Sequence, residues 1–285
     1  MTRLHDILAP AKLNLFLHVT GRRADGYHLL QSVFMLIDWC DRLHFELRRD
    51  GVISRSETSG EPLPADDLCV RAARALQAAT GTPLGVHIHL EKNIPSQAGM
   101  GGGSSDAAAC LLALQRLWQV NLPRPELQAL ALRLGADVPF FLSGGHAWVE
   151  GVGEQLTPIT LPAGRFLVVK PAAGLPTPAI FGSPELKRDS EPATILSFAA
   201  HQPRQMFEFG RNDLQPVAQQ LCPDITQALA WLRAQGLQGR MTGSGSAVFA
   251  PIPAGIEPNT TAPGLPEGFL VRTCSNLESH PLAGW

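Results

Sequence analysis

A glycine-dense turn runs directly into an alanine- and leucine-rich segment at residues 93–109. The segment reads Asn-Ile-Pro-Ser-Gln-Ala-Gly-Met-Gly-Gly-Gly-Ser-Ser-Asp-Ala-Ala-Ala. Glycines let backbone N–H groups crowd around one anion, and the start of a helix adds unpaired donors and a positive dipole. Pro95 fixes the entry to the turn, while Ser104 or Ser105 can cap the helix or offer a hydroxyl to a phosphate or Mg²⁺. The pattern therefore indicates a phosphate-binding turn.

Two common phosphate-binding motifs do not fit the spacing of this turn. The chain contains no Gly-x-x-x-x-Gly-Lys-[Ser/Thr], and the turn does not have the order Gly-x-Gly-x-x-Gly. A P-loop and a Rossmann fingerprint are therefore disfavoured. A flexible turn before an ordinary helix is the simpler alternative, so other residues must decide between the two.

Phosphate chemistry without a P-loop lysine needs another positive group, and Lys12 at the head of an expected strand is a candidate. Lysines are more commonly found on the surface, so its position alone proves little. Asp137 follows a helix expected to end at Gly135 and sits at a chain reversal. A carboxylate beside a lysine can accept an alcohol proton while the lysine keeps it ionised. A helix cap is the alternative role for Asp137.

The loop at residues 21–28 contains the only tyrosine of the chain, Tyr27, directly before His28. Together they offer a stacking face and a hydrogen-bonding group, as a nucleobase requires. An ordinary hairpin loop explains the same residues equally well. His87 and His89 share one face of an alternating strand, where we expect a solvated face rather than a metal site.

A second small-residue turn lies near the end of the chain, at residues 240–249. Its Thr-Gly-Ser-Gly core can bring backbone close to a ligand or to a neighbouring lobe. On its own, the pattern favours packing.

The composition is that of a globular protein without a broad charged surface. The chain has 285 residues, 45% of them hydrophobic, and a formal charge of −2, which is enough for a large core and two lobes. Such a balance predicts neither nucleic-acid nor membrane binding. The five scattered cysteines disfavour a disulfide framework and a zinc site, so we expect a cytoplasmic protein. No signal peptide or membrane span is expected.

Hydrophobic periodicity and turn residues predict alternating strands and helices. In the first half we expect strands at 13–19, 42–48 and 86–90 and helices at 67–79, 104–118 and 125–134. Prolines and short apolar runs begin near residue 156, where we place a lobe boundary. Beyond it we expect a strand at 166–170, a helix at 225–235, a surface connection at 251–268 and a last strand at 269–274.

Taken together, these segments resemble the GHMP kinase superfamily, over most of the chain up to about residue 250. The motifs that match in order are Pro-Ala-Lys-Leu-Asn-Leu-Phe-Leu at 10–17, Arg-Ala-Asp-Gly-Tyr-His at 23–28, the glycine turn at 95–105, Leu-Gly-Ala-Asp-Val-Pro at 134–139, Pro-Thr-Pro-Ala-Ile-Phe at 176–181 and Thr-Gly-Ser-Gly at 242–245. The second of these resembles the segment of members that act on a cytidine diphosphate-linked methylerythritol.

The resemblance implies a mixed α/β (α+β) fold with two lobes and an active site in the cleft between them. The N-terminal lobe, residues 1–155, would be ribosomal-protein-S5-domain-2-like and bind ATP. The C-terminal lobe, residues 156–285, would be ferredoxin-like and bind the substrate. The implied reaction is ATP-dependent phosphorylation of the substrate's 2-hydroxyl, with Mg²⁺, in the non-mevalonate route to isopentenyl diphosphate.

Residue by residue, the resemblance implies that Asp137 is the general base and Lys12 its charged partner. Tyr27 and Phe181 would enclose the cytosine, His28 would hydrogen-bond it, and Asn14 would lie near the acceptor alcohol. The ATP phosphates would be held by Pro95, Ser96, Gln97, Ala98, Gly99, Met100, Gly101, Gly102, Gly103, Ser104 and Ser105. The magnesium ligands stay open among Ser104, Ser105 and Asp106, the last of which could instead be a first-turn acid satisfying the helix dipole.

Two departures from the family pattern fall in the glycine turn. Residues 96–98 replace glycines found in some members, and Met100 stands where leucine is usual. We expect ATP binding to survive because Gly99 and residues 101–103 remain glycine. The stretch at 251–268 lacks a helix that members often carry. A mevalonate- or homoserine-type kinase and a catalytically silent nucleotide-binding module are the alternatives, and the sequence predicts no oligomeric state.

Overall fold

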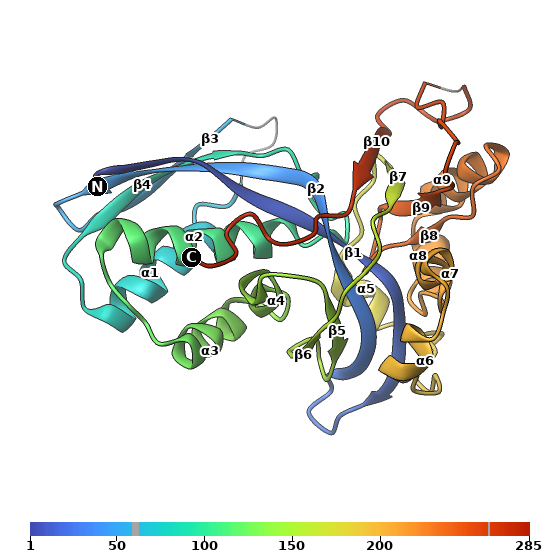
Figure 1. Ribbon diagram of the computed structural model, residues 1–285, viewed down its shortest axis with the longest axis horizontal. Helices are drawn as coiled ribbons and strands as arrows, with labels where there is room; N and C mark the ends of the chain where they lie inside the picture. Colours follow the sequence, from blue (N-terminus) through green and yellow to red (C-terminus); the bar gives the residue numbers. More distant parts are fainter. Residues whose placement is uncertain (59–62, 262) are drawn as a thin grey trace.

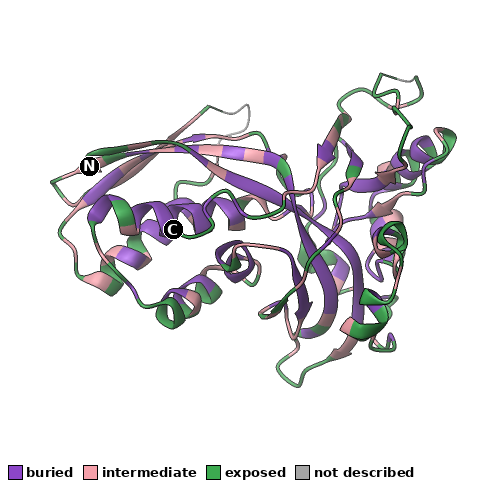
Figure 2. Ribbon diagram, in the orientation of Figure 1, coloured by how far each residue is buried: buried purple, intermediate pink, exposed green. Residues whose placement is uncertain are grey.

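A long antiparallel hairpin connects the two lobes of the molecule (Figure 1). The computed structural model describes residues 1–58, 63–261 and 263–285. Strand β1 covers Arg3–Arg22 and β2 covers His28–Arg48, and the two strands pair along almost their whole length. Their central parts are buried where they cross from one lobe to the other (Figure 2). The hairpin therefore carries side chains from its own strands into the space between the lobes.

The first sheet has the strand order β3-β4-β2-β5-β6, with β1 paired to β2. Strands β3 (Ile53–Glu57) and β4 (Gly85–Glu91) are parallel, and β5 (Ala147–Glu150) and β6 (Gln155–Pro158) form a small hairpin. One face of the sheet is covered by helices α1 (Leu68–Thr80) and α2 (Gly102–Trp118), beside α3 (Arg124–Leu134) and α4 (Val138–Ser143) (Figure 1).

Helix α2 lies at the centre of the first lobe. Its alanines at 107–109 and 113 are fully buried, so neighbouring elements can approach its backbone closely. In β4, Val86, Ile88 and Leu90 point into this core. His87 and His89 lie on the other face, where their rings hydrogen-bond Ser54, Ser56 and Thr58. This half-buried polar face of β3 and β4 replaces the solvated face expected from the sequence.

The second sheet has the order β10-β7-β9-β8, all antiparallel. Its strands are β7 (Arg165–Lys170), β8 (Arg240–Met241), β9 (Val248–Ile252) and β10 (Leu270–Ser275). The helices of this lobe are α5 (Thr177–Phe181), α6 (Ile195–Ala199), α7 (Pro203–Glu208), α8 (Gln215–Leu221) and α9 (Pro223–Ala234).

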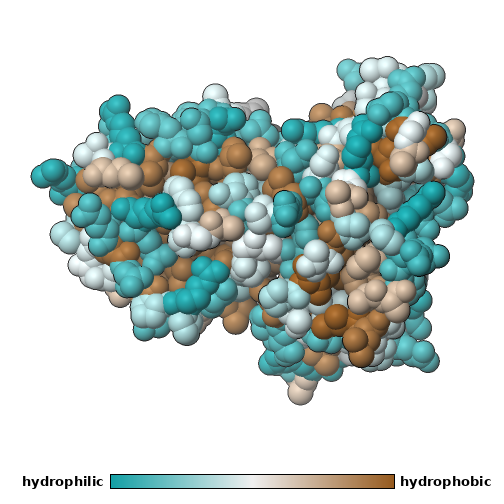
Figure 3. Space-filling view, viewed as in Figure 1, coloured by the Kyte–Doolittle hydropathy of each residue, from teal (hydrophilic) through white to brown (hydrophobic). Residues whose placement is uncertain are grey.

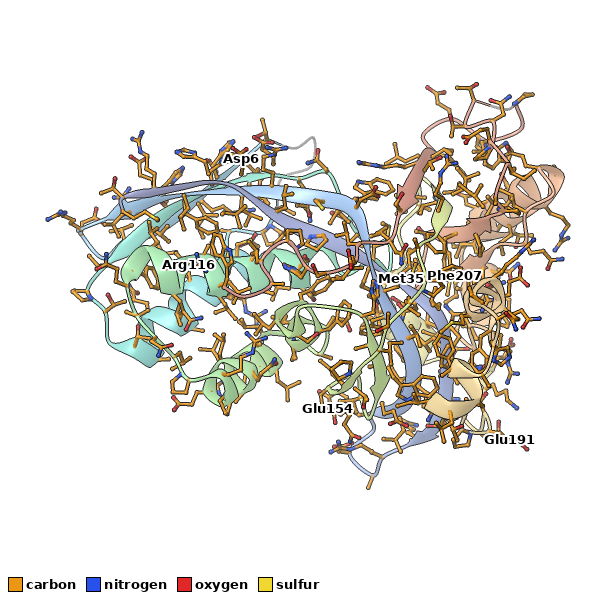
Figure 4. The ribbon with its side chains drawn as sticks, in the orientation of Figure 1. Asp6, Met35, Arg116, Glu154, Glu191 and Phe207 are labelled. Atoms are coloured by element: carbon orange, nitrogen blue, oxygen red, sulfur yellow. The ribbon has the colours of Figure 1, made fainter. Side chains whose placement is uncertain are left out.

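One core cluster spans the hairpin and the second lobe. Met35 of β2 and Phe207 of α7 both belong to it, while Glu154 lies in the turn between β5 and β6 (Figure 4). On the face drawn in Figure 3, hydrophobic side chains gather in several places among hydrophilic ones, one of them over the region of α6. Leu196 of α6 is exposed. No helix within the described residues is long and apolar enough to span a membrane.

The elements expected from the sequence are present, with shifted ends. The strand expected at 13–19 is the long β1, and α2 begins two residues earlier than expected, at Gly102. In the stretch 251–268, residues 251 and 252 belong to β9, and its other described residues contain no helix or strand; residue 262 lies outside the described residues. The lobe boundary between 155 and 156 stays a prediction, and β6 straddles it.

Candidate active site

A cavity of about 610 Å³ is lined by residues from both lobes. Its walls include Lys12 and Asn14 of β1, Asp137, residues 95–104 of the glycine turn, Phe181 of α5 and residues 243–245 of the second small-residue turn. Segments far apart in the sequence therefore meet at one site. Of the residues predicted for the site, Tyr27, His28 and Ser105 do not line this cavity.

The start of α2 at the cavity wall is not capped by any side chain. Gly101 occupies the N-cap position with a φ of 71°, in the left-handed region that favours glycine. Of the two roles open to Ser104 and Ser105, helix capping does not occur, because the helix already begins at Gly102 and both serines lie inside its first turns. Their role toward a phosphate or Mg²⁺ stays a prediction. Ser105 is fully buried, and no described residue hydrogen-bonds its hydroxyl. The uncapped N–H groups and helix dipole are suited to binding an anion.

The two small-residue turns pack against each other, backbone to backbone. The N–H of Ser246 donates to the carbonyl of Gln97 at 3.1 Å, and that of Ala247 donates to Ala98 at 3.2 Å. A Cβ on Gly99 would lie 2.2 Å from the carbonyl oxygen of Thr242, so no other residue fits without movement. The second turn thus fills the packing role favoured by the sequence and also lines the cavity.

The departure at residues 96–98 does not open the turn. Gln97 adopts a φ of 50°, which is uncommon for a residue with a side chain. Its amide packs tightly against Gly174, where an added Cβ would lie 2.2 Å from Oε1 of Gln97. Ala98 is buried. The local backbone is therefore fixed by contacts of residues 97 and 98, and retained phosphate binding stays a prediction.

Lys12 and Asp137 form an ion pair inside the cavity, with Nζ 3.5 Å from Oδ2. The Lys12 side chain is 4% exposed, and its backbone N–H donates to Met100 of the glycine turn at 2.9 Å. Burial lowers the pKa of Lys12, and the carboxylate of Asp137 opposes this shift by favouring the ammonium form. Asp137 sits at the N-cap position of α4, yet its side chain makes no capping hydrogen bond. Its carboxylate therefore stays free for Lys12 and for a ligand.

Asn14 is oriented by three neighbours. Its side-chain N–H donates to Ser32 Oγ at 2.9 Å, and its oxygen accepts a hydrogen bond from the Lys12 ammonium. Its backbone N–H donates to Thr242 Oγ1 at 2.9 Å. Lys12, Asn14 and the second small-residue turn therefore form one connected polar group.

His28 and Phe181 meet at the edge of the second lobe. Their ring centroids are 5.0 Å apart and the rings are tilted by 34°. Arg188, which the sequence did not single out, donates from Nε to His28 Nε2 at 3.0 Å. Tyr27 lies one residue before His28 in the hairpin turn, with 65% of its surface exposed. Its ring makes no ring contact within the described part of the chain, so it is free to pack on a ligand.

A buried ionic cluster that no sequence motif indicates lies at the entry to the glycine turn. Lys92 Nζ pairs with Asp106 Oδ2 at 2.9 Å and with Asp41, whose other oxygen accepts the N–H groups of Asn93 and Ile94 at 2.6 Å and 2.7 Å. The cluster therefore holds the entry to the turn. Asp106 serves this ion pair, and not the first turn of α2 as one alternative had it.

The protonation states in this cluster follow from burial and from neighbouring charges. Burial disfavours the Lys92 ammonium, but Asp106 and Asp41 outweigh it and raise the lysine's pKa. Burial raises the pKa of Asp106 to about 8 against the lowering effect of Lys92, and Asp41 adds to the rise. Lys92 thus stays charged, and Asp106 is the group of this cluster that can hold a proton. No cluster of three or more His, Cys, Asp or Glu suited to a metal occurs within the described residues.

Comparison with known proteins agrees with this fold. Residues 67–145 match the family GHMP kinases N terminal domain, and residues 202–259 match GHMP kinases C terminal. A 4-diphosphocytidyl-2-C-methyl-D-erythritol kinase of Polaromonas sp. is 72% identical, covering 99% of this chain and 94% of that protein. A 4-diphosphocytidyl-2-C-methyl-D-erythritol kinase of Albidiferax ferrireducens is 64% identical, and the match covers 100% of this chain and 96% of that protein.

Solved structures extend the comparison. A crystal structure of a 4-(cytidine 5'-diphospho)-2C-methyl-D-erythritol kinase has a TM-score of 0.72 and 40% identity, covering 85% of this chain and 88% of that one. A homoserine kinase from Cytophaga hutchinsonii has a TM-score of 0.69 and 15% identity, and the match covers 98% of this chain and 96% of that one. At this identity the likeness shows a shared fold alone.

Fold and site thus define an ATP-using small-molecule kinase of the GHMP class, with a mixed α/β architecture. Within that class, the chain belongs to the 4-diphosphocytidyl-2-C-methyl-D-erythritol kinase family. The resemblance drawn from the sequence motifs is confirmed.

Proposed function

We propose that the protein transfers the γ-phosphoryl group of ATP to the 2-hydroxyl of 4-diphosphocytidyl-2-C-methyl-D-erythritol, a step toward isopentenyl diphosphate. Asp137 is the general base and Lys12 its charged partner. The observation that carries this proposal is their 3.5 Å ion pair, which lines the same cavity as the uncapped start of α2. A proton acceptor and an anion-binding backbone therefore face one enclosed space.

The glycine turn is the donor side of the site. Uncapped N–H groups at Gly102 and Gly103 and the dipole of α2 favour the triphosphate of ATP there. The buried ammonium of Lys12 adds a fixed positive charge beside the turn, because its backbone is hydrogen-bonded to Met100. Positioning and charge stabilisation supply most of the catalysis in phosphoryl transfer, where the transition state is loose.

The transfer step needs one proton acceptor. As the acceptor oxygen bonds to the γ-phosphorus, the bond from that phosphorus to the β,γ-bridging oxygen breaks and ADP leaves. The hydroxyl proton passes to Asp137 late in the step. Lys12 pairs with the carboxylate of Asp137 beforehand, and Asn14 can hydrogen-bond the acceptor from its position beside Lys12.

The acceptor's cytosine binds at the far end of the site, between Tyr27 and Phe181. The ring of Tyr27 is exposed and contacts no other aromatic ring of the described residues, and Phe181 lines the cavity. Aromatic faces stack favourably on a flat base. His28, already in contact with Phe181, supplies the hydrogen bond that recognises the base.

The cavity wall fits a Mg²⁺ ion that arrives bound to ATP. Such an ion takes most of its ligands from phosphate and water and needs only one or two protein oxygens. Ser104 and Asp106 carry oxygens at the wall, and no described residue hydrogen-bonds Oδ1 of Asp106. These two residues would hold the ion, with Asp106 in its ionised form, because a bound cation would favour loss of the proton that burial retains. When bound, Mg²⁺ neutralises charge on the phosphates.

An ADP-release assay with a panel of alcohol acceptors tests the proposal. We expect release with the cytidylyl compound and background rates with mevalonate and homoserine. Release with one of the latter alone would indicate a different small-molecule kinase, and no release with any acceptor would indicate a silent nucleotide-binding module. The cytoplasmic setting stays a prediction.

A further inference from the structure

Arg188 ties the segment after α5 to the first residue of β2. Its Nη2 donates to the carbonyls of Phe181 and Ser183 at 3.1 Å and 2.7 Å, and its Nη1 donates to Leu186 at 2.9 Å. The remaining contact is from Nε to His28 Nε2 at 3.0 Å. One guanidinium therefore holds the backbone of Phe181 and the ring of His28 together.

The contact with His28 has a fixed direction. A guanidinium carries only donors, so Nε2 of His28 must be the acceptor and must lack a proton. A neutral imidazole carries its single proton on the other nitrogen, and the hydrogen bond made by one nitrogen decides the tautomer. Burial lowers the pKa of His28, and the charges of Arg188 and Arg22 lower it further. The ring is therefore neutral near pH 7, with its proton on Nδ1.

The Nδ1–H group is then available to a ligand. It makes no hydrogen bond with any described residue, and the Phe181 ring beside it marks where a flat base would lie. Cytosine presents an unprotonated ring nitrogen, N3, which accepts a hydrogen bond. Uracil carries a proton on N3, so two donors would oppose each other there. A site that donates a hydrogen bond to cytosine N3 rejects uracil strongly, because the donor of the site and the N3–H of uracil would both be left unpaired.

We propose that Arg188 is a positioning residue that fixes His28 as an Nδ1–H donor and thereby makes the acceptor site select cytosine over uracil. This inference rests on the proposed function, because it assigns the base-recognition role to His28. Without Arg188 the ring is free to take the Nε2–H tautomer, which places an acceptor at Nδ1. Base selection and not phosphoryl transfer is the property that should change.

The first test needs no variant. Nitrogen-15 NMR of labelled histidine in the intact protein distinguishes protonated from unprotonated ring nitrogens. We expect His28, assigned by comparison with His28→Gln, to be protonated at Nδ1 and unprotonated at Nε2 at pH 7. A protonated Nε2 in the neutral ring would overturn the tautomer assignment whatever the acceptor proves to be.

The second test compares the cytidylyl acceptor with its uridylyl analogue. For Arg188→Gln we expect the ratio of the two kcat/KM values to fall about 10-fold or more, with the KM for ATP unchanged. In the His28→Gln background the same substitution should leave the ratio unchanged. The matched control is Lys187→Gln, which removes the charge of a neighbouring lysine that pairs with Asp189 and, among the described residues, makes no contact with His28 or Phe181.

Arg188→Lys keeps the charge and serves as the milder variant if Arg188→Gln does not fold. One ammonium cannot reach all four acceptors, so we expect an intermediate ratio. An unchanged ratio in both folded variants would overturn the proposal. A wild-type protein that phosphorylates neither nucleotide compound would instead contradict the proposed function, and the NMR result would still stand on its own.

Discussion

Gly99 and Gly243 meet backbone to backbone, joining the phosphate-binding turn of the first lobe to the second small-residue turn. A Cβ on Gly243 would lie 2.6 Å from the carbonyl oxygen of Gly99, and one on Gly99 would lie 2.2 Å from that of Thr242. Neither backbone can retreat freely, because Ser246 and Ala247 are hydrogen-bonded to residues 97 and 98. The contact fixes where the turn stands relative to Lys12.

Gly243→Ala is therefore expected to push the two turns apart. A side chain at a φ of +52° is itself unfavourable. The clash of the new Cβ with the carbonyl oxygen of Gly99 should lower the free energy of unfolding by a further ~2 kcal/mol and raise the KM for ATP about 10-fold. The control is Gly255→Ala, with a φ of +78° and no atom within 4 Å of the added Cβ. It should lose only ~1 kcal/mol and keep its KM. Equal effects from the two variants would contradict this role of the contact.

Tyr27→Ala should weaken binding of the acceptor and leave ATP binding unchanged. The variant removes one of the two rings proposed to enclose the cytosine, and the exposed ring has no packing role to lose. Steady-state kinetics should give a KM for the acceptor about 10-fold higher, while Tyr27→Phe keeps the wild-type value. A higher KM for ATP in the alanine variant would assign the stacking face to adenine instead.

The carboxyl of Asp106 makes stability depend on pH. Burial raises its pKa from 3.8 to about 8, so the folded protein holds a proton that the unfolded chain releases between these values. The free energy of unfolding contributed by this group therefore falls as pH rises from about 4 to about 8. Asp106→Asn keeps the shape and removes the titration.

We expect Asp106→Asn to melt about 2–4 °C above the wild type at pH 8, with the gap closing toward pH 5. Thermal melts across this range measure the difference. Asp66→Asn is the control, because its ion pair with Arg74 is exposed and should contribute little at any pH. A variant that melts below the wild type by a similar margin at pH 8 and at pH 5 would show instead that Asp106 is ionised in the folded protein and is stabilised by Lys92.

The parts of the site that were predictable from sequence lie in continuous motifs. The glycine turn, Lys12 and Asp137 each stand in a local pattern whose chemistry can be deduced from neighbouring residues. The ion pair itself joins positions far apart in the chain, so its pairing came from the family resemblance and not from any local pattern. Helix α4 was missed because it has only six residues and follows Asp137 with a proline in its first turn.

The missed residues act through contacts that periodicity does not encode. Lys92 lies 51 positions from Asp41, and Arg188 lies 160 positions from His28. Nothing in the sequence indicates that Lys92 is buried between two carboxylates. The full length of β1 could not be predicted from alternation, since irregularities between Leu4 and Ile7 and between Val19 and Gly21 each place an extra residue in β1 and interrupt the alternation of its side chains.

The turnover of Asp137→Asn tests the central claim most directly. Asparagine keeps the shape of the side chain and its place at the start of α4 but cannot accept the proton of the acceptor's hydroxyl. We predict a kcat lower by roughly 10²- to 10⁴-fold, with the KM values for ATP and acceptor close to those of the wild type. Near-normal turnover in this variant would contradict the assignment of Asp137 as the general base.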